Sequence, residues 1–423
     1  MAVVRDEEAS AVASRARSLL RRNRDFRLLW FGESVSGMGT AITYLALPFV
    51  ALNRLHASTF QVAALSALET MAWPLLGLPA GVWVDRWSRR RVLIMTDVGR
   101  ALALSSIPVA AGFGVLGLPQ LFAVAAVTGV LTLFFAVAYP TYLPTVVEKN
   151  DLVEGNSLLS GTESFSQVSG PAIAGALVQA IGAAYAVVAD VVSYVVSAVS
   201  LTAIRSPEPP AVAQRRAMRH EVAEGVRFLA HHRVLRAFIA AAAISNFFAG
   251  GAQAIAVVFL VNTVHVRAGV VGLLFAIGAG GGIVGAVVAA RLVRRIGDAR
   301  AMVLAAVVEA TSAYLVPATA RGWGLIFFCA GTAIAGFSII VFNVVGGSYR
   351  QEIIPARLMG RAVAANRMVT WGVLPLGSLT AGWLATSIGV RSALWVLAIG
   401  LALAPISLAA AGLASLRELP RTT

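Results

Sequence analysis

The chain has little of three things that soluble enzymes use freely: cysteine, lysine and charge. Cys329 is the only cysteine and Lys149 the only lysine among 423 residues, and 13% of the residues are charged. One cysteine excludes an internal disulfide and any metal site built from several cysteines. The Gly-Lys-Ser/Thr end of a phosphate-binding loop is absent, which excludes ATP as a direct fuel. None of the five histidines lies in the middle of an apolar run, so we expect no catalytic site, metal site or cofactor.

Apolar residues, in contrast, are abundant. They make up 58% of the chain, and the mean hydropathy is +0.80, values that indicate a protein crossing a bilayer many times. A bilayer core needs about 20 apolar residues per helix. The sequence therefore predicts twelve spans, at residues 27–52, 61–84, 92–116, 119–145, 156–181, 183–204, 235–262, 268–292, 300–318, 323–348, 360–387 and 391–415.

Positive charges are distributed unevenly between alternate loops. If both termini and the even-numbered loops share one side, that side carries 28 Lys and Arg residues and the other side carries four. Because positive residues stay on the cytoplasmic side of a membrane, both termini are predicted to be cytoplasmic. The net charge of +14 could suit nucleic acid, but its short bursts between apolar runs fit anionic membrane lipids instead. We expect no nucleic-acid partner.

The longest loop divides the chain into two similar halves. Five positions of the segment Ala174–Gly182 carry the same residue as the position 207 residues later. This repeat predicts two six-helix bundles of the same orientation. Apolar residues at helical spacing within the loop predict a short amphipathic helix along the membrane surface. The predicted organisation is an N-terminal arm at 1–26, a first bundle at 27–204, a linker with an amphipathic helix at 205–234, a second bundle at 235–415 and a tail at 416–423.

A short, intensely basic loop, GVWVDRWSRRR, lies between the second and third runs at Gly81–Arg91. The spacing of Gly81, Asp85, Arg86 and Arg90 strongly resembles the loop after the second helix in the major facilitator superfamily. The resemblance implies an all-α membrane protein with twelve transmembrane helices in two pseudo-symmetric six-helix bundles.

Two further segments, Asn156–Gly175 and Leu374–Gly377, resemble the branch of that superfamily that contains bacterial drug, macrolide and siderophore exporters. In the superfamily, the acid of the basic loop helps to latch the two bundles on the cytoplasmic side, which implies this role for Asp85. A carboxylate near the start of the eleventh run would gain about 0.3–1 kcal/mol from the helix dipole. The alternative is a loop that only anchors the protein to anionic lipid. The predicted gate residues are Gly81, Asp85, Arg86, Arg90, Asp97, Arg100, Arg361 and Arg367.

Asp97 and Arg100 lie three residues apart in the third run, so the two side chains can pair on one helix face. Drug–proton exporters of the superfamily commonly carry an arginine in the fourth helix, and the fourth run of this chain contains none. Arg100 is the nearest substitute by depth. It is either an element of a proton relay or half of a structural ion pair near the gate.

Three glutamates, Glu33, Glu69 and Glu163, lie inside predicted spans. Ionisable residues within a bilayer are costly and mark functional sites, and a carboxyl group in an apolar cavity can take and release a proton near neutral pH. These three are the predicted proton-coupling residues, although Glu33 could instead join an ion pair at the gate. Asp190 and Glu309 are predicted to be structural acids that are satisfied within the fold.

Aromatic and polar side chains on cavity-lining runs can bind flat hydrophobic compounds or stack on cations. Packing or lipid contact is the alternative for each of them. The candidate cavity residues are Thr40, Tyr44, Trp73, Phe134, Gln167, Phe247, Phe342 and Trp371. Gly170, Pro171 and Gly175 resemble a helix motif of drug exporters, with the second glycine one position late, and such small residues allow close helix packing.

These features predict a secondary transporter that exports hydrophobic or amphipathic small molecules, such as antibiotics, by alternating access driven by inward proton flow. One alternative is an importer or facilitator of a nutrient or metabolite on the same scaffold, and another is a membrane scaffold that transports nothing. We expect a small-molecule substrate, protons and membrane lipids as partners. We also expect a monomer in the bacterial cytoplasmic membrane.

Overall fold

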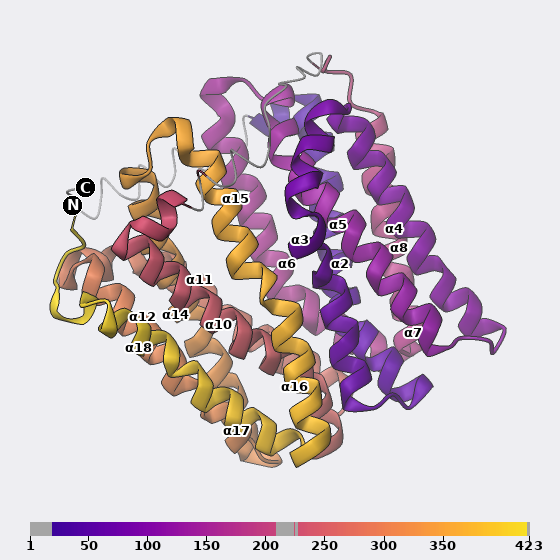
Figure 1. The fold of residues 1–423 in the computed structure, drawn as a ribbon. Coiled ribbons are helices and arrows are strands. Elements are labelled where there is room, and N and C mark those ends of the chain that lie inside the picture. Colours follow the sequence, from indigo (N-terminus) through magenta and orange to yellow (C-terminus); the bar gives the residue numbers. More distant parts are fainter. Residues whose placement is uncertain (1–18, 209–223, 225–226, 421–423) are drawn as a thin grey trace. The chain divides into compact units, whose positions relative to one another are not determined.

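The computed structural model describes residues 19–208, 224 and 227–420, and every regular element in that part of the chain is helical (Figure 1). Helices dominate because a chain crossing lipid must satisfy its backbone hydrogen bonds internally. The first half contains α2 (Arg24–Leu55), α3 (Thr59–Arg86), α4 (Arg89–Gly112), α5 (Leu118–Val146), α6 (Leu152–Ile181), α7 (Ala183–Ala186) and α8 (Val188–Thr202). The second half contains α10 (Arg233–Val258), α11 (Ala268–Ile296), α12 (Asp298–Ser312), α13 (Leu315–Ala318), α14 (Leu325–Ile353), α15 (Ala356–Gly372), α16 (Leu374–Ile388), α17 (Val390–Leu401) and α18 (Leu403–Ala410).

Ten helical stretches of the described residues are long and apolar enough to cross a membrane. The number is eleven if the two parts of α3, Thr59–Gly77 and Pro79–Arg86, count as one bent span. Each of the twelve predicted runs overlaps one α-helix or two consecutive α-helices. One predicted run, 156–181, corresponds to a helix that is not among the candidate spans. This helix, α6, has 30 residues but carries Glu163, Gln167 and several hydroxyl side chains. The helix is therefore long enough to cross a bilayer, but it is polar along much of its length.

The turns of the two halves repeat with nearly the same offset as the sequence. His56 (φ 49°) and His265 (φ 58°), 209 residues apart, are the non-glycine residues with positive φ in the described chain. Gly182 (φ 84°) and Gly389 (φ 87°) follow α6 and α16 in matching conformations, 207 residues apart. Because positive φ is uncommon outside glycine, the recurrence of these turns confirms the internal repeat. The chain is an all-α membrane protein built from two pseudo-symmetric bundles.

The contacts divide the chain into two compact units that differ from the predicted bundles in one segment. The first unit comprises residues 1–47 and 76–214, and the second comprises 48–75 and 215–423. Residues 48–75 lie in the first bundle by sequence, yet they group with the second unit. The physical reason is close packing, since Gly382 of α16 lies directly against Phe60 and Ala63 of α3.

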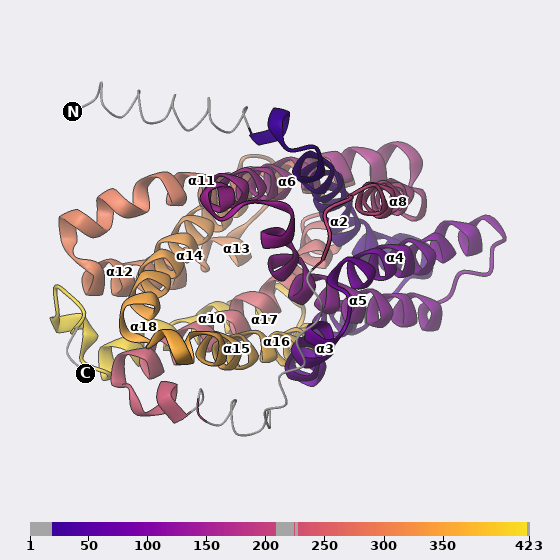
Figure 2. The ribbon, with the colours of Figure 1, turned by 90° about the horizontal axis from the view of Figure 1, so that it is seen from above.

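Each unit has its own apolar interior. In the first unit, α4 packs against α5 and α8, and Figure 2 shows these three helices side by side. In the second unit, α11 packs against α14 through small residues. A side chain at Gly281 or Gly285 would overlap the backbone of Ala333 or Phe337, so these glycines serve close helix packing.

Two predicted segments lie mostly outside the described residues. They are the N-terminal arm at 1–26 and the amphipathic helix of the linker at 205–234. The predicted tail at 416–423 is described as far as Pro420, and its Leu419 is only 3% exposed. This part of the tail is therefore packed against the second unit.

Candidate functional site

A buried ion pair lies in the interior of the first unit. Arg100 Nη2 is 2.5 Å from Asp97 Oδ1, and the two residues are 3% and 0% exposed. The guanidinium lies between two aromatic rings, with its Cζ 4.5 Å from the centroid of Phe135 and 4.1 Å from that of Tyr194. A desolvated cation gains about 2 kcal/mol or more from such ring faces. The rings thus replace the water that this arginine lacks.

Glu33 on α2 interacts electrostatically with this ion pair and with Glu163 on α6. The Glu33 side chain is partly buried, whereas that of Glu163 is exposed. Glu163 accepts a hydrogen bond from Gln167 Nε2 at 3.4 Å. The Thr40 hydroxyl on α2 is hydrogen-bonded to the Tyr194 hydroxyl at 2.8 Å. Two of the three predicted coupling acids therefore lie in one polar region of the first unit.

The third predicted coupling acid, Glu69, belongs to the second unit, where it is partly buried on α3. One turn later, Trp73 packs edge-on against Trp371 of α15, with ring centroids 4.6 Å apart. The Arg367 guanidinium lies 6.0 Å from the Trp371 ring centroid. The fold thus brings two predicted cavity residues together beside a predicted gate residue.

The basic loop is held by an acid that the sequence analysis did not single out. Ser88 is the N-cap of α4, and its hydroxyl donates to Glu208 Oε2 at 2.7 Å. The backbone N–H groups of Arg89 and Arg90 donate to the same carboxylate at 2.5 and 3.5 Å. A carboxylate is stabilised at a helix N-terminus because the unpaired N–H groups and the helix dipole are both positive there.

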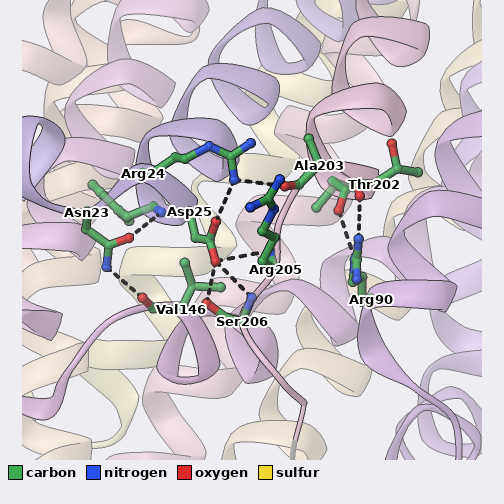
Figure 3. Close-up of polar contacts among 11 residues, drawn as sticks. Asn23, Arg24, Asp25, Arg90, Val146, Thr202, Ala203, Arg205 and Ser206 are labelled. Atoms are coloured by element: carbon green, nitrogen blue, oxygen red, sulfur yellow. Dashed lines mark hydrogen bonds and ion pairs between the residues drawn. The ribbon is translucent and has the colours of Figure 1, made fainter.

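A second acid outside the spans, Asp25, holds the chain that leads to Glu208 (Figure 3). Asp25 Oδ2 accepts the backbone N–H groups of Arg205 at 3.1 Å and Ser206 at 2.8 Å, as well as the Ser206 hydroxyl at 2.7 Å. The Arg90 side chain donates to the Thr202 carbonyl at 2.5 Å, at the end of α8. Asp25 and Glu208 lie outside the predicted spans, so the rule that an acid within the membrane marks a functional site gives no signal for them.

The remaining predicted gate residues are spread over both units. Asp85 and Arg86 are exposed at the end of α3. Apart from its chain neighbours and the backbone of its own helix, no described atom lies within 4 Å of the position that a Cβ of Gly81 would take, so packing against other described segments does not explain this glycine. Arg361 forms an ion pair with Glu224 of the linker.

One predicted cavity residue lies in a packed core instead. Phe342 is 8% exposed and stacks on Phe238, with ring centroids 4.7 Å apart, so it packs the interior of the second unit. Phe134 is partly buried and stacks with Trp83 and Trp87 at centroid distances of 5.9 and 6.1 Å. Its ring is part of an aromatic cluster at the end of α3.

The other cavity candidates remain accessible to differing degrees. Tyr44 is 52% exposed on α2, and Gln167 is exposed on α6. Phe247 is partly buried on α10 and packs edge-on against Phe248, with ring centroids 5.0 Å apart.

The predicted helix-packing motif makes a close contact. A Cβ at Gly170 would overlap the side chain of Ala41, which shows that α2 and α6 approach closely at this point. Gly175 is buried, and Pro171 lies within the continuous helix α6.

Two acids predicted to be satisfied within the fold are only partly so. Asp190 on α8 is 1% exposed and Glu309 on α12 is 4% exposed. In each carboxyl group one oxygen has no hydrogen-bond partner among the described residues. Within the described chain, no group of three or more His, Cys, Asp and Glu side chains could hold a metal ion.

Comparison with known proteins identifies the family. The family model described as transmembrane secretion effector matches residues 18–420. The chain is 27% identical to the multidrug efflux pump Tap of Mycolicibacterium fortuitum, over 93% of this chain and 96% of the relative. It is 24% identical to macrolide efflux protein A of Streptococcus pyogenes, over 86% and 90% of the two chains.

Solved structures with the same fold are transporters. The nucleoside transporter NupG superposes with a TM-score of 0.74 at 14% identity, covering 92% of this chain and 99% of NupG. A bacterial homologue of the iron transporter ferroportin, in an inward-facing state, gives a TM-score of 0.72 at 18% identity, covering 92% and 98%. With the family match, the helical repeat and the resemblance of the basic loop, the chain belongs to the transmembrane secretion effector family of major facilitator transporters.

Proposed function

We propose that this protein exports hydrophobic or amphipathic small molecules from the bacterial cytoplasm by proton-coupled alternating access. The similarity to multidrug and macrolide efflux proteins over most of the chain supports an efflux transporter. The observation that carries the coupling part of the proposal is the polar region of the first unit, in which Glu33 interacts with Arg100, Asp97 and Glu163.

In the proposed cycle, a carboxylate takes a proton from the outside, the substrate leaves, and the proton is released inside. Glu33 is the first choice for this carboxylate because it lies beside a fixed positive charge. Arg100 is held in place by Asp97 and two aromatic rings. A change in the packing of α2 against α4 during the cycle would therefore change the interaction between Glu33 and this fixed charge. Glu69 and Glu163 are the second choices.

The basic loop is proposed to act on the cytoplasmic side. Arg90 and Glu208 hold the loop to the end of α8 and the start of the linker, so the loop moves with the first unit. Asp85 is exposed and remains the proposed latch, with Arg361 or Arg367 as its proposed partner. We also propose that the protein is a monomer, that it interacts with membrane lipids, and that both of its termini lie in the cytoplasm.

Transport by everted membrane vesicles tests this function. With a macrolide antibiotic as the probe, an interior-acid gradient should drive accumulation, and a protonophore should abolish it. Glu33→Gln should remove gradient-driven accumulation, whereas Glu148→Gln, an exposed acid outside the spans, should not. Accumulation that runs in right-side-out vesicles instead would show import. If Glu33→Gln, Glu69→Gln and Glu163→Gln all left coupled export intact, the assignment of the coupling residues would be wrong.

A further inference from the structure

A second buried acid lies close to the Asp97–Arg100 ion pair in the first unit. Asp190 on α8 is 1% exposed and interacts electrostatically with both members of the pair on α4. The helices that carry these residues, α4 and α8, pack directly against each other. The interior of this unit therefore holds Asp97, Asp190 and one guanidinium close together, and Glu33 of α2 interacts with the same ion pair.

The hydrogen bonds of this region are incomplete. Asp190 Oδ1 accepts the Ser193 hydroxyl at 3.0 Å. Asp190 Oδ2 has no donor within ordinary hydrogen-bond distance among the described residues, although the Thr43 hydroxyl of α2 also interacts with this carboxyl group. The same is true of Asp97 Oδ2 and of Arg100 Nε. A buried carboxylate oxygen without a donor is strongly unfavourable, whereas a protonated carboxyl group carries no charge and can itself donate.

Among the described residues, Arg100 is the cation that interacts with Asp190. The groups that face it are Asp97 and Arg100 from α4, and Tyr194 from its own helix interacts with the same carboxyl. From α2, the Gly39 backbone packs against the Asp190 carboxyl, and that helix contributes the Thr43 hydroxyl. One guanidinium cannot neutralise two buried carboxylates, and two acids sharing one site cannot both ionise cheaply.

We propose that Asp190 binds a proton while Asp97 is paired with Arg100, and that loss of this proton makes the two carboxylates compete for the same guanidinium. The step is a simple ionisation. The O–H bond of Asp190 breaks, its electron pair stays on the carboxylate, and the proton passes to water. Asp190 then has the same charge as Asp97, and Arg100 lies between two equal partners.

The use of this proton in transport rests on the proposed function, because release of a proton from Asp190 can contribute to export only if export is coupled to protons. The consequence is mechanical. Arg100 is fixed between Phe135 of α5 and Tyr194 of α8, so a change of its ion-pair partner would shift α4 against α8. A proton at Asp190 would in this way set the packing of the first unit.

Infrared difference spectroscopy of the whole protein in lipid tests the proton directly, without transport. The protein should show carbonyl absorption from protonated, buried carboxyl groups, and Asp190→Asn should remove one component of this band, measured as the difference from the unaltered protein. Asp97→Asn should remove it as well, because Arg100 then pairs with Asp190 and keeps it ionised. Asp151→Asn, which alters an exposed ion pair with Arg22, is the matched control and should leave the band unchanged.

Two results would overturn the proposal. One is a carbonyl band whose intensity is unchanged by Asp190→Asn in a folded protein. The other is loss of the band on addition of sodium ions at constant pH, which would show that a metal cation rather than a proton balances the charge. Folding is checked by size-exclusion chromatography of each variant.

A transport measurement then separates this proposal from the proposed function. Asp190→Asn should lose uphill export in everted vesicles but still equilibrate the probe down its gradient. If the unaltered protein itself shows no proton-driven export, the proposed function fails, while the infrared result on Asp190 still stands or falls on its own.

Discussion

In each half of the chain, the segment that follows the last helix folds back onto the start of an earlier helix and is held there by an acid. The acid lies on the returning segment in the first half and on the helix start in the second. In the first half, Glu208 follows α8 and reaches back to the start of α4. In the second half, the segment after α18 reaches back to the start of α12, where Asp298 Oδ1 accepts the Leu419 N–H at 2.7 Å. Ser88 and Gly297, which precede the two helices, are 209 residues apart. The repeat has thus preserved the place of the contact and its carboxylate-to-backbone chemistry, but not the side of the contact that carries the acid.

The second closure also differs in how much apolar surface it buries. Leu413 and Leu419 are 1% and 3% exposed, and the Tyr349 hydroxyl donates to the Pro420 carbonyl at 2.8 Å. The first closure consists mainly of the carboxylates of Asp25 and Glu208. Equivalent contacts in the two halves are therefore stabilised mainly by charged hydrogen bonds in the first half and mainly by apolar packing in the second.

The helix caps next to these corners differ in a related way. Asn23 Oδ1 accepts the Phe26 N–H at the start of α2 at 2.9 Å. His232, 209 residues later, accepts the Leu235 N–H through Nδ1 at the start of α10 at 3.4 Å. An amide does not titrate near neutral pH, whereas an imidazole does. Only the second half therefore has a titratable cap at this position.

The largest expected effect breaks the apolar closure. Leu419→Ala should lower the free energy of unfolding by about 2–5 kcal/mol, because it removes a fully buried side chain and leaves a cavity. The measurement is unfolding in mixed micelles by titration with dodecyl sulfate. Glu418→Ala changes the exposed neighbour and should have little effect. Equal effects of the two variants would contradict a packed tail.

A smaller effect is expected at Gly297, where the tail meets the start of α12. Gly297 has φ 90° and ψ 157°, a conformation that costs other residues about 1–3 kcal/mol, and its Cβ would also overlap the Arg417 carbonyl. Gly389 has nearly the same backbone (φ 87°, ψ 150°) with no atom within 4 Å. Thermal unfolding should therefore show Gly297→Ala to be less stable than Gly389→Ala, and the difference reports the tail contact. Matching melting curves would argue against that contact.

The charged closure should respond to a polar substitution. Glu208→Ala should cost about 1.5–3 kcal/mol, because the α4 N-terminus loses hydrogen bonds to a charged acceptor. Glu208→Gln should restore part of this stability, since the amide oxygen still accepts a hydrogen bond. Unfolding measurements with Glu148→Ala as the control check this expectation. No difference between Glu208→Ala and the control would mean that the carboxylate does not hold the loop.

The smallest effect sharpens the comparison of the two caps. Burial lowers the pKa of His232 below its ordinary value of 6.5. The neutral imidazole accepts the Leu235 N–H, so the stabilisation is present above pH 6.5 and is lost as the pH falls through the lowered pKa. The loss should be about 1 kcal/mol or less. Melting temperatures at neutral and mildly acidic pH should fall further apart in the unaltered protein than in His232→Asn, which keeps the cap without the titration. If the melting temperatures of the unaltered protein and of His232→Asn depended equally on pH, groups other than His232 would be responsible for that dependence.

The sequence predicted the spans and the repeat well because both depend on long apolar runs. Hydropathy alone placed each predicted span to within a few residues of the described helices, but not the breaks between α7 and α8, α12 and α13, α15 and α16, and α17 and α18. An i, i+3 spacing was enough to predict the Asp97–Arg100 pair. The aromatic partners of Arg100 could not be predicted in this way. Phe135 and Tyr194 come from other helices, and their meeting depends on packing geometry rather than on local pattern.

Other features of the site depend on contacts that are remote in the chain. Phe342 resembled a cavity residue because it lies in the middle of a span, but which face of a helix is buried depends on its neighbours. Glu208 is 120 residues from Ser88, and nothing in the local sequence connects them. The closure by the tail is equally remote, since Asp298 and Leu419 are 121 residues apart.

The polarity of α6 has a consequence for the way this protein enters the membrane. A polar segment is released into lipid by the insertion machinery less readily than an apolar one, and α6 carries Glu163 and Gln167 among many hydroxyl groups. The close contact of Gly170 with Ala41 of α2 offers this segment a protein surface instead of lipid. Biogenesis of the first half should therefore depend on α2 being in place when α6 is synthesised, and a ribosome-bound chain that lacks α2 should leave α6 uninserted.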